Sequence, residues 1–119
     1  MLFRSRARYF AAWIAEDEGD IAGATESFGR LGNAGNDSIR QESRFRHAYG
    51  LYRTGRHTEA IAAFEVGETG GDGPVERARH RYWKARALRD AGRGAEAEPI
   101  FAVLGGDAFA GIYGIFATR

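Results

Sequence analysis

Apolar residues recur three and four positions apart through most of this chain, in stretches separated by short breaks that contain glycine. This spacing is typical of amphipathic α-helices, in which such residues share one face. The pattern predicts seven helices, at residues 3–18, 20–31, 38–54, 56–66, 74–91, 93–104 and 107–117. The seventh is expected to have Asp107 as its cap and to need a partner for an apolar stripe made of Phe109, Ile112, Tyr113 and Phe116.

The first six stretches form a repeat with a period of 36 and then 37 residues, counted from Gly19, Gly55 and Gly92. Four matched positions recur, at ten and seven residues before each glycine and at five and nine residues after it. They hold, in that order, Tyr9, Phe45 and Tyr82; Ala12, Ala48 and Ala85; Ala24, Ala60 and Ala97; and Phe28, Phe64 and Phe101.

Glycine can end a helix in the left-handed conformation, and small alanines let two helices approach while a phenylalanine fills the space at the crossing. Each repeat is therefore predicted to be a helical hairpin, with the aromatic residue ten before the glycine in the core. The prediction is an all-α domain of three hairpins, at about 3–32, 38–67 and 74–105, plus an extra helix at 107–117.

Boundary signals fit these hairpins. The segment from Ser38 to Gln41 has the pattern of a capping box, and Pro74 stands where a first-turn proline loses no hydrogen bond. Pro99 falls inside the sixth predicted helix and is expected to kink it or delay its start.

The glycine, the alanine five later and the aromatic nine later resemble the tetratricopeptide repeat (TPR), which implies a right-handed α-solenoid. The period is longer than the usual one, and the early tryptophan-leucine pair of that repeat is missing.

The last third of the chain resembles the superhelical linker region of soluble lytic murein transglycosylases. The resemblance lies in the helix from Ala78 to Leu88, which contains Tyr-Trp-Lys-Ala-Arg-Ala, in the turn at Gly92 and in Tyr113-Gly-Ile-Phe-Ala. This resemblance implies a periplasmic scaffold for peptidoglycan, with a lysozyme-like catalytic domain elsewhere in a longer protein.

The composition excludes several classes of protein. The 119 residues suit one domain, and 44% hydrophobic with 28% charged residues is the balance of a soluble globular protein. A net charge of +1 gives no overall attraction to nucleic acid, and no apolar run is long enough for a membrane span. There is no cysteine, and the charged residues Glu16 and Asp17 argue against a signal peptide in this segment.

Glu42 lies in Ile39-Arg-Gln-Glu-Ser-Arg-Phe45, which looks like the segment around the catalytic glutamate of the same transglycosylases. We do not expect catalysis, because the family's Gly-Leu-Met-Gln segment is missing and a general acid needs a desolvated pocket. The more ordinary interpretation is a solvated glutamate near a helix start.

The sequence gives little indication of a metal, calcium or phosphate site. His47, His57 and His80 stand at unrelated positions of the repeat, so a metal site is not expected. The acidic run from Glu16 to Asp20 lacks the alternating ligands of a calcium loop. The glycines at 67–73 follow a predicted helix rather than a strand, so a phosphate-binding loop is not expected either. No cofactor is predicted.

Two surfaces are candidates for binding. Stacked repeats would align a basic stripe of Arg4, Arg8, Arg40, Arg44, Arg77 and Arg81, which either recognises anions or pairs with the glutamates. A candidate groove on the first helices holds Trp13, Tyr49, Tyr52, Arg86 and Arg89, which either contact a ligand or pack between repeats.

The leading hypothesis is a non-catalytic scaffold segment that engages a peptidoglycan glycan in the periplasm. The alternative is a generic tetratricopeptide module that binds a protein or peptide, and an enzyme acting through Glu42 comes last.

Overall fold

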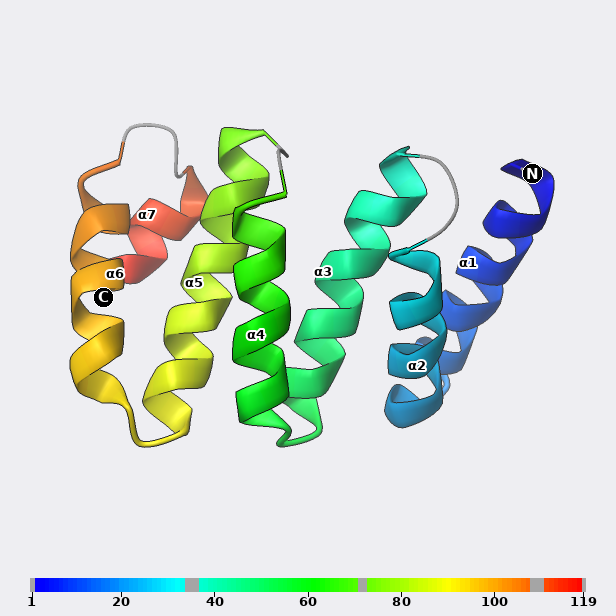
Figure 1. Ribbon diagram of the computed structural model, residues 1–119, viewed down its shortest axis with the longest axis horizontal. Coiled ribbons are helices and arrows are strands. Elements are labelled where there is room, and N and C mark those ends of the chain that lie inside the picture. Colours follow the sequence, from blue (N-terminus) through cyan, green and yellow to red (C-terminus); the bar gives the residue numbers. More distant parts are fainter. Residues whose placement is uncertain (1, 34–36, 71–72, 108–110, 119) are drawn as a thin grey trace. The chain divides into compact units, whose positions relative to one another are not determined.

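The computed structural model describes residues 2–33, 37–70, 73–107 and 111–118, and all regular structure in these ranges is helical (Figure 1). The seven helices are α1 (Leu2–Asp17), α2 (Ile21–Leu31), α3 (Asp37–Arg53), α4 (His57–Glu68), α5 (Pro74–Asp90), α6 (Gly94–Gly105) and α7 (Ile112–Ala117). The chain divides into two compact units, Met1–Arg56 and His57–Arg119. We call them the first and second unit.

The predicted all-α class is confirmed, and α1 to α6 begin and end within two residues of their predicted bounds. The seventh helix was placed wrongly at its start. Gly111, with φ of +58°, directly precedes α7, so this helix begins at Ile112. Asp107 does not cap α7, because Gly111 is the N-cap residue of this helix and no side chain of the described residues caps it; the Asp107 backbone N–H donates to Leu104 O at 3.2 Å, at the end of α6. Phe109 lies outside the described residues.

The three turn glycines adopt the left-handed conformation that the sequence predicts for them. Gly19, Gly55 and Gly92 have φ of +98°, +82° and +80°. After each of them, the next backbone N–H reaches back five residues, as in the bonds of Asp20 to Ala15 O at 2.9 Å and Arg93 to Leu88 O at 2.8 Å. This bond, together with one from the glycine N–H to the carbonyl three residues earlier, forms a Schellman motif, so α1, α3 and α5 end by the same mechanism.

In the first unit α2 packs against both α1 and α3 (Figure 1). The core there contains Ala12, Ala24, Phe28 and Leu31, with half-buried Tyr9, Ala15 and Ile39 packed against it. The close approach of α3 to α2 occurs at Gly50, where an added Cβ would collide with the Thr25 side chain. A small residue thus lets α3 approach α2 closely at this point.

In the second unit α5 packs against α4 and α6, and α7 packs against α6 and α5 (Figure 1). Tyr82 of α5 is the hub of an aromatic cluster: its ring centroid lies 5.8 Å from Phe101, 5.6 Å from Tyr113 and 5.8 Å from Phe116. Tyr113 and Phe116 of the predicted stripe therefore have a packing partner, whereas Ile112 is 56% exposed. At the α4–α5 contact, Phe64 meets His80 edge to face with ring centroids 5.9 Å apart.

The repeated alanines and phenylalanines are all buried, as predicted. Of the aromatics ten residues before each glycine, Tyr82 is buried, whereas Tyr9 and Phe45 are half-buried, so the assignment of all three to the core was too strong.

Pro74 occupies the first turn of α5, as predicted. Ser38 lies inside α3, which begins at Asp37, so it is not the N-cap of a capping box. Pro99 lies inside α6 and does not delay its start, because the helix already begins at Gly94.

Candidate functional site

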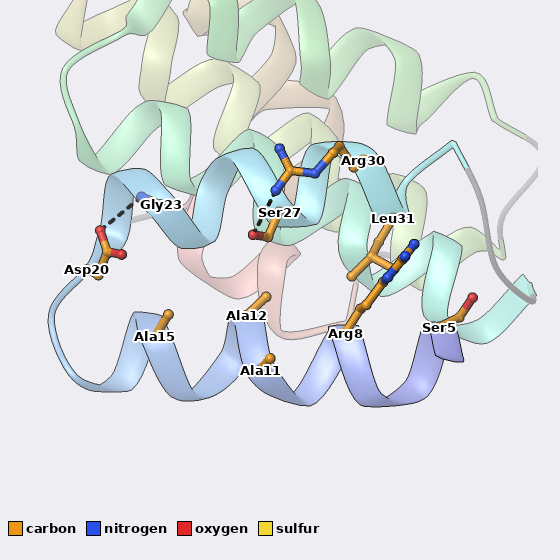
Figure 2. A pocket seen from close by; sticks show the side chains of 10 residues that line it. All are labelled: Ser5, Arg8, Ala11, Ala12, Ala15, Asp20, Gly23, Ser27, Arg30 and Leu31. Carbon is orange, nitrogen blue, oxygen red and sulfur yellow. Dashed lines mark hydrogen bonds between the residues drawn. The ribbon is translucent and has the colours of Figure 1, made fainter. Parts of the chain in front are cut away.

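The first unit has a hollow of about 660 Å³ between α1 and α2 (Figure 2). Three alanines of α1 form its floor, and α2 contributes polar side chains. Its lining consists of Ser5, Arg8, Ala11, Ala12, Ala15, Asp20, Gly23, Ser27, Arg30 and Leu31.

The charges of this hollow are separated along its length. Figure 2 shows the Arg8 side chain reaching from α1 toward the end of α2, where Arg30 lies, while Asp20 is at the opposite end. Asp20 accepts a hydrogen bond from Gly23 N at 3.0 Å and so caps α2, and Arg30 donates to Ser27 Oγ at 3.2 Å. Arg8 makes no hydrogen bond or ion pair with the residues that the structure describes. Two guanidinium groups beside an apolar floor suit an anionic group carried on an apolar stem.

Arg8 belongs to the predicted basic stripe, and its counterparts in the other repeats have structural partners. Arg44 donates from Nε to the Gly32 carbonyl oxygen at 3.2 Å, at the end of α2. Arg81 Nε lies 3.8 Å from Glu68 Oε2, at the end of α4. In both units the arginine eleven residues before the turn glycine therefore contacts the end of the helix that precedes its own.

The remaining stripe residues differ in exposure. Arg4 is exposed, whereas Arg40 and Arg77 are half-buried and each engages in an interaction of its own. Because the stripe runs through both units, its alignment as one continuous surface stays a prediction.

The second unit has a hollow in the third hairpin that shares four lining positions with the hollow of the first unit. This smaller hollow of about 280 Å³ is lined by Arg81 and Lys84 of α5 and by Pro99, Ile100 and Val103 of α6. Glu68 of α4 also lines it, and its carboxylate lies 2.7 Å from Lys84 Nζ. Counted from the turn glycine, Arg8 and Arg30 take the positions of Arg81 and Val103. A carboxylate from a neighbouring helix thus lines the hollow of the third hairpin, beside Lys84.

The predicted groove residues of the first unit lie on two helices. On α3, Tyr49 stacks on Phe45 with ring centroids 5.8 Å apart and on Tyr52 at 6.2 Å, and the Arg53 guanidinium lies 5.6 Å from its centroid. Tyr49 and Tyr52 are half-buried, so only part of each ring is open to a ligand. Trp13, on α1, is 48% exposed.

In the second unit Arg86 lies 5.4 Å from the Trp83 ring centroid and donates to Tyr82 Oη at 3.1 Å. Arg89 is exposed and lies 5.0 Å from the Phe101 centroid. Both arginines line a hollow of about 420 Å³ together with Glu98 and residues of α7. The aromatic contacts of Arg86 and Arg89 agree with the packing interpretation, although Arg89 is also exposed.

The environment of Glu42 is open and charged. Its side chain is 37% exposed, and Oε1 lies 3.5 Å from Arg46 Nε. Arg46 also reaches Glu16 Oε1 of α1 at 3.0 Å, so these charges join α1 to α3. A general acid of the lysozyme type needs a carboxyl in an apolar pocket, and this surrounding is different.

The histidines serve packing. His47 Nδ1 lies 2.9 Å from the Thr25 carbonyl oxygen, and His80 is fully buried against α4. Over the described ranges, no group of three or more His, Asp or Glu side chains could hold a metal ion. In the same ranges, no helix has both the length and the apolar character to cross a membrane.

The sequence interpretation missed Arg30 and the contact between Gly67 and His80. Arg30 could have been found by aligning the repeats, because the same position holds Val66 and Val103. An added Cβ at Gly67 would collide with the His80 imidazole, and no sequence pattern indicates that these two residues meet.

Comparison of the chain with protein families found no matching family, and searches of curated proteins and of solved structures returned no similar protein.

Proposed function

We propose that this chain is a non-catalytic scaffold segment of a protein similar to the soluble lytic transglycosylases, built as a right-handed TPR-like α-solenoid, and that it engages peptidoglycan in the periplasm. One observation carries the proposal. Tyr82, from the Tyr-Trp-x-Ala-Arg-Ala helix, packs 5.6 Å from Tyr113, from the Tyr-Gly-x-x-Ala helix. The two pieces of sequence that carry the resemblance therefore belong to one packed cluster, as parts of a shared structural motif should.

The stacking of hairpins in a solenoid is supported by contacts that repeat in the two units. Arg44 and Arg81, at equal positions in their repeats, each approach an oxygen at the end of the preceding helix. A solenoid predicts such equivalence, because each repeat contacts only its neighbours and in the same manner.

A non-catalytic role is supported by the surroundings of Glu42. The Glu42 side chain is 37% exposed and its carboxylate lies 3.5 Å from Arg46 Nε, a charged partner rather than an apolar enclosure. The test is incubation of purified peptidoglycan with the wild type and with Glu42→Gln. Neither protein should release soluble glycan fragments, and release by the wild type alone would refute the non-catalytic role.

Binding to peptidoglycan is tested by sedimentation with purified, insoluble cell-wall sacculi. The wild type should pellet with the sacculi, and Trp13→Ala should pellet less, because an exposed indole supplies flat contact area to a sugar ring. Val103→Ala, at a residue that is 63% exposed on α6, is the control for removing surface apolar area and should bind like the wild type. If the wild type stays in the supernatant, peptidoglycan engagement is wrong.

The second candidate function is a tetratricopeptide module that binds a protein or peptide. The position of Glu68 at the third hairpin's hollow favours it, since the hollow beside Arg8 shares four lining positions with that hollow. A helical peptide with glutamate in its last turn is the probe. Its affinity, measured by fluorescence anisotropy, should fall for Arg8→Gln and not for Arg4→Gln, and equal affinities for all three proteins would exclude this site.

A further inference from the structure

One face of α1 is apolar and exposed. Phe10 is 47% exposed, Trp13 48% and Ile14 54%, and the rings of Phe10 and Trp13 lie 6.3 Å apart. Tyr9 and Ala12 of the same helix pack into the core of the first unit, and the Tyr9 ring also lies 5.7 Å from the Phe10 ring, at the edge of the exposed face. Exposed apolar patches built from several large side chains mark interaction surfaces.

This face has a charged residue at each end. Arg6, Phe10, Trp13 and Asp17 are spaced four, three and four residues apart, which places them in one line along the helix. Arg6 and Asp17 are exposed, and neither pairs with a residue of the described ranges. We call this line, with Ile14 beside it, the outer stripe.

The charges of α1 are also segregated. Its first half carries Arg4, Arg6 and Arg8 and no acidic residue, whereas its acidic residues, Glu16 and Asp17, lie in the last turn. Glu16 pairs with Arg46 of α3 at 3.0 Å, which leaves Asp17 as the acidic group of the outer stripe.

We propose that the outer stripe of α1 pairs antiparallel with the outer stripe of a second copy of this chain. The residue numbers make the stripe self-complementary: a two-fold axis midway between residues 11 and 12 places Phe10 against Trp13 of the second copy and Arg6 against Asp17 of the second copy. Because a two-fold interface uses each contact twice, it contains two aromatic pairs and two ion pairs.

Other occupants match this stripe less well. A parallel copy would place Arg6 against Arg6 and Asp17 against Asp17, which repel. An acidic helix of another protein would match the basic end and be repelled at Asp17. An antiparallel copy satisfies both ends, and its opposed helix dipoles also attract.

The test is sedimentation equilibrium over protein concentrations up to about 1 mM, which covers weak affinities. The wild type should be a reversible dimer of modest affinity, because one face of a single helix buries less surface than a standard interface. Arg6→Asp places two pairs of like charges in the dimer and should weaken association at least about tenfold. Asp17→Arg should weaken it similarly, and the double variant should restore association to within about threefold of the wild type.

Arg4→Asp is the matched control, because it makes the same charge change two residues away, on a different side of the helix. It should dimerise like the wild type. A protein that is monomeric throughout the concentration range, a double variant that does not recover, or equal losses from Arg4→Asp and Arg6→Asp would each overturn the proposal.

A second measurement locates the interface. The chain has two tryptophans, so Trp83→Phe leaves Trp13 as the single reporter. Its emission should shift to shorter wavelength as protein concentration rises, since dimerisation removes the indole from water. A dimer whose Trp13 emission does not change would place the interface elsewhere and refute pairing through the outer stripe.

Discussion

The contact between α4 and α5 is tested by Gly67→Ala. Gly67 lies in α4, and a Cβ built on it collides with three ring atoms of His80. The imidazole cannot swing out easily, because it is fully buried and its other side meets Phe64 edge to face at 5.9 Å.

The expected cost follows from two opposing effects. Overpacking a well-filled helix contact costs about 3 kcal/mol at the upper end of its usual range, which fits a collision with a whole ring. Alanine favours a helix over glycine by about 1 kcal/mol. We therefore expect Gly67→Ala to lower the free energy of unfolding by about 2 kcal/mol.

Urea denaturation followed by circular dichroism measures this free energy, with His80→Ala as the second arm of a double-mutant cycle. Once the ring is removed, the collision disappears and only the helix preference remains. Gly67→Ala should then be neutral or stabilising in the His80→Ala background. If it destabilises both backgrounds equally, the close approach of Gly67 to His80 is not the cause and the reasoning fails.

Three further predictions concern stability. Ser43→Ala should raise the free energy of unfolding by about 1 kcal/mol, because the buried Ser43 hydroxyl has no hydrogen-bond partner among the described residues; a loss of stability in urea denaturation would contradict this. Gly92→Ala should lower the free energy of unfolding by about 1–2 kcal/mol through strain at a φ of +80°, whereas Gly94→Ala, where a Cβ meets open space, should not lower it. The hydrogen bond from Arg93 lowers the pKa of Glu96, so this pair stabilises the fold above the ordinary carboxyl pKa and the effect is lost as pH falls through the lowered value. Glu96→Gln should therefore flatten the acid limb of a stability-against-pH curve, and an unchanged limb would show that the pair does not contribute.

The sequence predicted the helices well where local chemistry decides them. The turn glycines fix the ends of α1, α3 and α5, and the matched alanines and phenylalanines identify the buried faces. The predicted start of α7 was wrong because Asp107 is an acceptable cap by residue type, whereas the helix has Gly111, with φ of +58°, at its N-cap position. Residue type alone does not decide which of several acceptable positions begins a helix.

The candidate site was less predictable. The repeat identified Arg8, Arg44 and Arg81 as equivalent, but whether an arginine faces solvent or holds the end of a neighbouring helix depends on what packs beside it. The same reason explains Trp13 and Tyr49, which share a position in the repeat and differ in exposure. Equal positions predict equal direction from a helix axis, whereas the neighbouring side chains differ from one repeat to the next.

The packing partners of the described helices have a kinetic consequence. Within each unit, every helix packs against the next helix in the chain or the next but one. Contacts between segments so near in sequence require only short loops to close, which costs little chain entropy before they form. Chains with this topology reach the native state on the microsecond-to-millisecond scale, so stopped-flow refolding should miss most of the signal change within its dead time.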